Sequence, residues 1–154
     1  MSIEAKLAER GLTLPDAPAA AANYVPYVLA GGLLHIAGQI PFDEQGELMR
    51  GTVGAEVDTD AAYKAAQRCA LAILAQAKAA LGGLDRIEKI VKLNVFVASA
   101  PGYTEQPKVA NGASDLMADL LGEAGRHARS AVGVAALPLG VSVEIDAILL
   151  PCDD

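Results

Sequence analysis

The chain has 154 residues, of which 53% are hydrophobic, and it carries a formal net charge of −7 at pH 7. This length is sufficient for one domain with a sizeable core. The acidic charge argues against a surface that binds nucleic-acid phosphates, and charged residues interrupt each apolar stretch before it reaches the length of a membrane span. We therefore expect no nucleic-acid partner and no membrane partner, and small molecules are the better candidate ligands.

The mean hydropathy of +0.32 is high for a chain without a membrane span, which suggests that some surface is buried against other copies of the chain. Residues 1–10 alternate charged with apolar side chains and lack the apolar core of a secretory signal, which predicts a cytoplasmic protein. Cys69 and Cys152 form no CxxC pair, and His residues are too few for a metal cluster. We expect two plain thiols, no metal and no cofactor.

The first predicted elements are strands. Two apolar runs between Val28 and Ile40 are separated by Gly31-Gly32, which is typical of a tight hairpin. A second turn signal at residues 43–46 follows, so the segment Leu48–Val53 is a candidate third strand before the first helix.

A helix is predicted over residues 58–81, because apolar side chains recur there every three or four residues. Asp58, Thr59 or Asp60 can cap its start, and Gly82-Gly83 can end it in the left-handed conformation. The segment Ile87–Ala98 then alternates in the period-two pattern of a strand.

A second helix is predicted after this strand, with Thr104 as its cap and Pro107 in its first turn. Its buried stripe is expected to consist of Val109, Ala113, Leu116, Met117 and Leu120.

Two strands, Ala128–Ala135 and Val141–Leu150, are predicted in the last third of the chain, joined by residues 137–140. The element order is thus β-β-(β)-α-β-α-β-β, an α+β sheet with both helices on one face. The opposite face of the sheet then needs a cover, and self-association is the simplest way to supply it.

Arg129 and Glu144 each interrupt a strand that is otherwise built of small and apolar residues. A charge in such a place needs a partner, and that partner can be a structural ion pair, solvent at a strand edge or a ligand. Asp146 shares the face of Glu144 two residues further along the strand. The pattern alone leaves the structural and the functional interpretation open for both residues.

The segment His127–Ala147 resembles the C-terminal signature of the RidA/YjgF family, which runs A-R-S, a short variable strand, L-P and then V-x-[IV]-E-[IV]-[ED]-A. The segment Ile36–Pro41, I-A-G-Q-I-P, is similar to the S-G-Q-I-P segment of that family, and Ile90–Val97 resembles its V-K-x-x-V-F-V strand. The matches follow one another in family order between Tyr24 and Ala147.

This resemblance implies a chorismate-mutase-like α+β fold and a homotrimer with pockets between neighbouring subunits. Residues 1–154 would form a single domain, with an N-terminal extension over about residues 1–22. The implied activity is the cofactor-free hydrolysis of reactive enamine and imine intermediates to 2-oxo acids and ammonia, as in a 2-iminobutanoate/2-iminopropanoate deaminase. The implied ligand is a carboxylate-bearing imine, such as one related to 2-aminoacrylate, or a 2-oxo acid.

Three residues fall on positions that the family uses in catalysis. Arg129 matches the arginine that holds the substrate carboxylate, and Glu144 matches the glutamate that places or activates water. Tyr24 matches the site tyrosine, because it aligns up to Gly38 without a gap, whereas Tyr27 would require a deletion.

The resemblance also implies that the substrate contacts Gly38, Ala37 and Asn111 in addition to Arg129. Gly38 can equally be a close-packing position, and Asn111 can equally be a surface residue of its helix. His127 shares a strand face with Arg129 and is either a border of the pocket or a solvated residue at the strand edge.

The chain departs from the family pattern in several places. Ala37 replaces the usual Ser, Ala131 occupies a position where well-known deaminases often have Cys, and the chain is longer than the usual member. These departures indicate a divergent subgroup whose substrate can differ. The alternative function is a non-catalytic sensor of 2-oxo acids that uses the same pocket. A ribonuclease or translation-inhibitor activity is a further alternative, against which the acidic charge counts.

Overall fold

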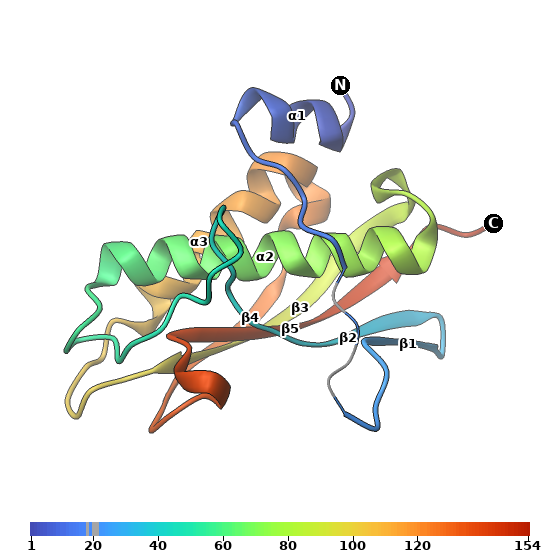
Figure 1. Cartoon of the computed structure of the whole chain (residues 1–154). Coiled ribbons are helices and arrows are strands. Elements are labelled where there is room, and N and C mark those ends of the chain that lie inside the picture. The colour runs from blue at the N-terminus through green and yellow to red at the C-terminus, as the bar shows by residue number, and fades with distance from the viewer. Residues whose placement is uncertain (18, 20–21) are drawn as a thin grey trace.

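The computed structural model describes residues 1–17, 19 and 22–154, and its centre is a five-stranded sheet with helices on one face (Figure 1). The strands are β1 (Tyr27–Ala30), β2 (Leu33–Gln39), β3 (Ile87–Ala98), β4 (Ala128–Val134) and β5 (Val143–Pro151). The helices are α1 (Ile3–Glu9), α2 (Thr59–Leu81) and α3 (Gln106–Leu121), with short 3-10 turns at Leu84–Arg86, Gly122–Gly125 and Pro138–Gly140. The α+β class expected from the sequence is confirmed.

The strands lie in the order β1-β2-β5-β3-β4, so β1 and β4 form the two edges. The β3–β4 pair is parallel, and the other three pairs are antiparallel. A parallel pair needs a crossover connection, and α3 supplies it on the same face as α2. The edge strand β4 therefore lies beside α3.

The predicted hairpin is confirmed, because β1 and β2 pair around Gly31 and Gly32. Both glycines have positive φ, 62° and 78°, as a two-residue turn of the type that matches strand twist requires. The hairpin fixes the register Tyr27↔Ile36.

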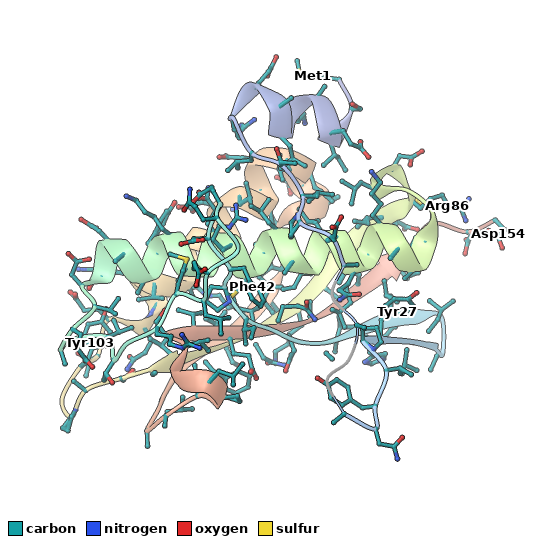
Figure 2. The ribbon with its side chains drawn as sticks, in the orientation of Figure 1. Met1, Tyr27, Phe42, Arg86, Tyr103 and Asp154 are labelled. Atoms are coloured by element: carbon teal, nitrogen blue, oxygen red, sulfur yellow. The ribbon has the colours of Figure 1, made fainter. Side chains whose placement is uncertain are left out.

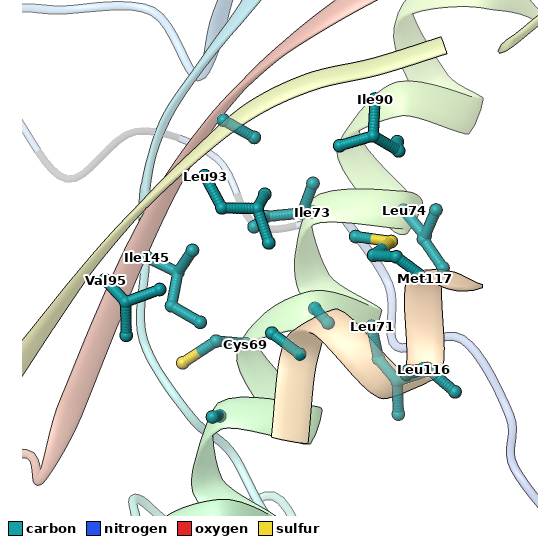
Figure 3. Close-up of a cluster of buried hydrophobic side chains, with 14 of the residues drawn as sticks. Cys69, Leu71, Ile73, Leu74, Ile90, Leu93, Val95, Leu116, Met117 and Ile145 are labelled. Atoms are coloured by element: carbon teal, nitrogen blue, oxygen red, sulfur yellow. The ribbon is translucent and has the colours of Figure 1, made fainter. Parts of the chain in front are cut away.

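The predicted first helix is confirmed as α2. The Asp58 side chain caps it by accepting a hydrogen bond from the Ala61 N–H at 2.7 Å, and Gly82 ends it with a φ of 87°. Figure 3 shows buried side chains of this helix directed toward the sheet, such as Ile73, and toward α3, such as Leu74. Cys69 is one of them, and burial raises the pKa of its free thiol well above the ordinary value.

The second helix, α3, carries its predicted stripe, since Val109, Ala113, Leu116, Met117 and Leu120 are all buried. Its predicted cap is wrong. The N-cap residue is Glu105 rather than Thr104, and no side-chain hydrogen bond caps the helix. The Gln106 side chain instead donates to the Tyr103 carbonyl at 2.7 Å, and Pro107 lies in the first turn as expected. The Tyr103 hydroxyl lies 2.7 Å from the Thr59 hydroxyl at the start of α2, at the end of the molecule where Figure 2 labels it.

The candidate strand Leu48–Val53 does not form. Its backbone hydrogen bonds go to unrelated partners, such as Gly51 N–H to the Gly140 carbonyl and Val53 N–H to the Ala98 carbonyl, and only isolated bridges result. Gly51 has a φ of 122°, which breaks the extended conformation. Phe42, which forms one of these bridges with Leu48, is labelled in Figure 2. The Arg68 Nε donates to its carbonyl at 2.6 Å.

Helix α1 lies within the N-terminal extension and was not predicted. Ser2 caps it by accepting from the Ala5 N–H, and Leu7 is its buried residue. The Lys6 Nζ donates to the Leu120 carbonyl of α3 at 3.1 Å. Helix α1 therefore rests on the outer side of the helix layer, away from the sheet (Figure 1).

We predict that Gly112→Ala destabilises the chain. A Cβ at Gly112 would lie 2.0 Å from the Tyr63 carbonyl oxygen, so α2 and α3 would have to separate. Overpacking of this kind costs about 1–3 kcal/mol, or roughly 3 °C in Tm per kcal/mol for a chain of this size. Thermal unfolding measures it, with Asp119→Ala on the exposed face of α3 as the control. An equal or higher Tm for Gly112→Ala would contradict the close approach of the helices.

Candidate functional site

Arg129 lies on β4 and points to the helix-covered face of the sheet. It pairs with Leu93, which is fully buried beneath the helices. Its Nη1 donates to the Asn111 Oδ1 at 2.8 Å and to the Ser114 Oγ at 3.1 Å, both on α3. The crossover connection thus places a sequence-predicted pair, Arg129 and Asn111, in direct contact.

The hydrogen bonds of Arg129 leave one edge of its guanidinium available. Nη1 has two hydrogens, and the two acceptors on α3 use both. Within residues 1–17, 19 and 22–154, Nε and Nη2 donate no hydrogen bond, and no carboxylate lies within ion-pair distance of Arg129. A partly buried cation with a free two-donor edge is suited to a carboxylate, which accepts two parallel bonds.

A cavity of about 310 Å³ opens beside this guanidinium. It lies between the C-terminal half of α3 and the start of β4. Its lining residues are Ser114, Asp115, Ala118, Gly125, Arg126, His127 and Arg129. A small acid can therefore reach the region of Arg129 from solvent.

His127 is held on the wall of this cavity rather than solvated at the strand edge. Its Nδ1 lies 2.7 Å from the Gly125 carbonyl oxygen, and its Nε2 lies 2.9 Å from the Ser114 Oγ. Burial lowers the pKa of His127, and the positive charge of Arg129 lowers it further, against the opposing effect of the bond to Gly125. The imidazole is therefore neutral at neutral pH.

Glu144 lies on the opposite, open face of the sheet. It pairs with Phe96, and Phe96 pairs with Val132, whose side chain is 45% exposed. Gly38 lies directly against Glu144, since a Cβ there would be 2.7 Å from the Glu144 Oε2. The glycine therefore leaves the space that the carboxylate occupies. Burial, together with the charge of Asp146, raises the pKa of Glu144.

Ala37 precedes Gly38 on β2, and the segment that carries Tyr24 leads into β1. The Ala37 N–H donates to the Pro26 carbonyl at 2.9 Å, which holds the segment before β1 alongside β2. Residues 22–26 lie on the side of the sheet away from the helices (Figure 1), and the Tyr24 side chain is 54% exposed.

One chain therefore separates the sequence-predicted residues into two sets. The arginine set consists of Arg129 and Asn111 on the helix side, and the glutamate set consists of Glu144 and Gly38 on the open face. Within a strand, side chains alternate between the two faces, so the two sets cannot converge in one copy of the chain. Ser114 was not predicted as a partner of Arg129. Its spacing of three from Asn111 on a predicted helix places both residues on one helix face.

Most of the chain matches a known family. Residues 4–146 match the family described as "YjgF/chorismate_mutase-like, putative endoribonuclease". The chain belongs to the RidA/YjgF family. The resemblance seen in the sequence is thereby confirmed.

Individual relatives agree with this assignment. The chain is 51% identical to the protein TCP17 of Trypanosoma cruzi over 96% of its own length and 92% of that protein. The crystal structure of the protein Atu1372 from Agrobacterium tumefaciens has a TM-score of 0.91 and 52% identity, over 98% of this chain and 94% of that one. Coverage of 98% takes in most of the N-terminal extension. The structure of E. coli TdcF with bound serine has a TM-score of 0.61 and 28% identity, over 87% of this chain and 92% of that one.

Two further findings concern other classes of site. In the part of the chain that the structure describes, no helix is long and apolar enough to cross a membrane. Among those same residues, no cluster of three or more His, Cys, Asp or Glu side chains is arranged to hold a metal ion.

We expect ionisation of the Glu144 carboxyl to lower the free energy of unfolding, so that stability depends on pH. Its folded-state pKa is raised above the ordinary value of 4.5. The protonated carboxyl therefore contributes to stability at low pH, and this contribution is lost as pH rises through the folded pKa. Glu144→Gln should therefore raise Tm at pH 7.5 but not below pH 4.5.

The conservative variant Asp146→Asn isolates the second cause. It should lower the pKa of Glu144 in a carboxyl NMR titration, while the bond from the Asn94 Nδ2 at 2.7 Å can persist. An unchanged Glu144 titration in Asp146→Asn would show that the neighbouring charge has no influence.

Proposed function

We propose that this protein hydrolyses reactive imines derived from amino acids, releasing 2-oxo acids and ammonia without a cofactor. The observation that carries the proposal is the free Nε and Nη2 edge of Arg129, a residue that also lines an open cavity. A carboxylate held there would keep the imine carbon in a fixed place, which is the main requirement for a reaction that already proceeds slowly in water. That TdcF was solved with serine, an amino acid, adds support for this class of ligand.

We further propose that each pocket is shared between two subunits of a homotrimer. The arginine set of one copy would meet the glutamate set of its neighbour, which resolves their separation within a single chain. The open face of the sheet also needs a cover, because it exposes apolar side chains such as Val28 at 48% and Val132 at 45%. Tyr24 would complete the pocket next to Glu144, and the backbone at Ala37 and Gly38 would line it.

The chemistry then follows from the two sets. Water adds to the imine carbon, and Glu144 takes a proton from that water and returns it to the nitrogen. This gives a carbinolamine. Glu144 then takes the hydroxyl proton and passes it to the amine, so the C–N bond breaks as the C=O bond forms and ammonia leaves. A carboxyl group whose pKa is raised toward neutrality can both accept and return a proton, so the half-buried position of Glu144 suits this role.

A sensor that binds 2-oxo acids without turnover would use the same arginine edge. Ala131 favours this alternative, because it lies two residues along β4 from Arg129 and carries no reactive group. Measurement of turnover distinguishes the two functions.

We predict that Arg129→Lys lowers kcat/KM for imine hydrolysis on the order of ten-fold or more. Lys retains the charge but not the planar pair of donors, so the substrate loses its alignment with water. Glu144→Gln should lower kcat by about 10²-fold while 2-oxobutanoate still binds. The assay follows 2-oxo-acid release from imines generated in situ, with Tm as the control for folding. Full activity in Arg129→Lys would refute the deaminase proposal, and binding without any acceleration by the wild type would favour the sensor.

The proposed homotrimer predicts that light scattering gives about three times the chain mass of 15.8 kDa.

The shared pocket further predicts complementation between inactive variants. When Arg129→Ala and Glu144→Gln proteins are unfolded together and refolded, some interfaces combine an intact Arg129 with an intact Glu144, so activity should return. Each variant refolded alone is the control. A monomer, or a mixture as inactive as its parents, would contradict a pocket built by two chains.

A further inference from the structure

His127, Ser114 and Arg129 form a chain of hydrogen bonds whose direction is fixed at each step. The Gly125 carbonyl can only accept, so the His127 Nδ1 must carry the hydrogen in their 2.7 Å bond. In a neutral imidazole the Nε2 is then an acceptor, and the Ser114 hydroxyl must donate to it across 2.9 Å. The Ser114 oxygen is left to accept from the Arg129 Nη1 at 3.1 Å.

The same nitrogen of Arg129 meets a second acceptor. Nη1 also donates to the Asn111 Oδ1 at 2.8 Å, so both of its hydrogens are directed toward α3. Two bonds from one nitrogen fix the rotation of the planar guanidinium. The plane then presents its opposite edge, Nε and Nη2, away from these acceptors.

We propose that Ser114 and His127 are positioning residues, which hold the Arg129 guanidinium in the orientation that receives the substrate carboxylate. The proposal rests on the proposed function of Arg129 as the carboxylate clamp. A free arginine side chain has many rotamers, and ordering it beforehand reduces the entropy lost when the ligand binds. The backbone carbonyl of Gly125 anchors this arrangement to the turn that precedes β4.

The surroundings of His127 are consistent with a neutral acceptor. It is partly buried, and the cations Arg129 and Lys89 both disfavour a charged imidazole. Arg126 and the carboxylate of Asp115 line the same cavity, and the Asp115 Oδ2 accepts from the Tyr63 hydroxyl at 2.7 Å. A protonated Nε2 would instead donate to the Ser114 oxygen, so the stated direction of this bond holds for the neutral form.

The test compares binding of 2-oxobutanoate with binding of 2-oxobutanamide, which lacks the carboxylate. Ser114→Ala and His127→Phe should each weaken binding of the acid about five-fold, the effect of one neutral hydrogen bond, and leave binding of the amide unchanged. His127→Gln should restore most of the affinity, because its amide oxygen can accept from Ser114. The double variant should be no worse than either single variant, because the residues act in series.

Asp119→Ala, on the exposed face of the same helix, is the matched control and should bind both ligands as the wild type does. Equal losses for acid and amide would show a structural role and overturn the proposal, as would wild-type affinity for the acid in Ser114→Ala. NMR of the wild-type protein provides a measurement that needs no variant. At pH 7.5 the His127 Nε2 should resonate as an unprotonated nitrogen, and a protonated Nε2 would overturn the proposal.

The outcome of Arg129→Lys separates this proposal from the one on which it rests. If Arg129→Lys binds 2-oxobutanoate as tightly as the wild type, Arg129 is not the clamp and both proposals fail. If Arg129→Lys loses binding while Ser114→Ala retains it, the clamp stands and only the positioning role fails.

Discussion

The parallel pairing of β4 with β3 is the constraint on which the rest of the site depends. Strand β4 is an edge strand, and its parallel pairing requires a crossover connection. The connecting helix α3 therefore lies over the helix-covered face, where Arg129 meets two of its polar side chains. Strand β5, the antiparallel neighbour of β3, presents Glu144 to the other face of the same sheet. The geometry of paired strands thus decides which of the candidate residues meet within one copy of the chain and which lie on opposite faces of its sheet.

Much of the fold could be predicted from the sequence because its signals are local. The glycine pair of the first hairpin, the cap at Asp58 and the alternation within Ile87–Ala98 each act over a few residues, and each gave the right element. The failures lie where distant groups decide. The segment Leu48–Val53 bonds to residues far along the chain, and the short helix α1 depends on packing against α3 and the turn at Leu84–Arg86.

The candidate site was predictable to a different degree. The resemblance predicted Arg129, Glu144 and Gly38 as candidates, but the motif alone did not show that Arg129 and Glu144 lie on opposite faces of the sheet. Ser114 and His127 could not be found as partners of Arg129 from spacing alone, because the bonds between them join a helix to a strand. Such bonds depend on where α3 packs, and Gly112 permits its close approach to α2, since a Cβ there would lie 2.0 Å from the Tyr63 carbonyl oxygen.

The position of α1 has a practical consequence for the handling of this protein. Met1 is labelled on the outer side of the helix layer in Figure 2, whereas the open sheet face lies on the other side of the molecule. A surface or bead coupled through the N-terminus would therefore hold the chain by its helical side. The open sheet face would point away from that support, so the coupling itself would not obstruct this face.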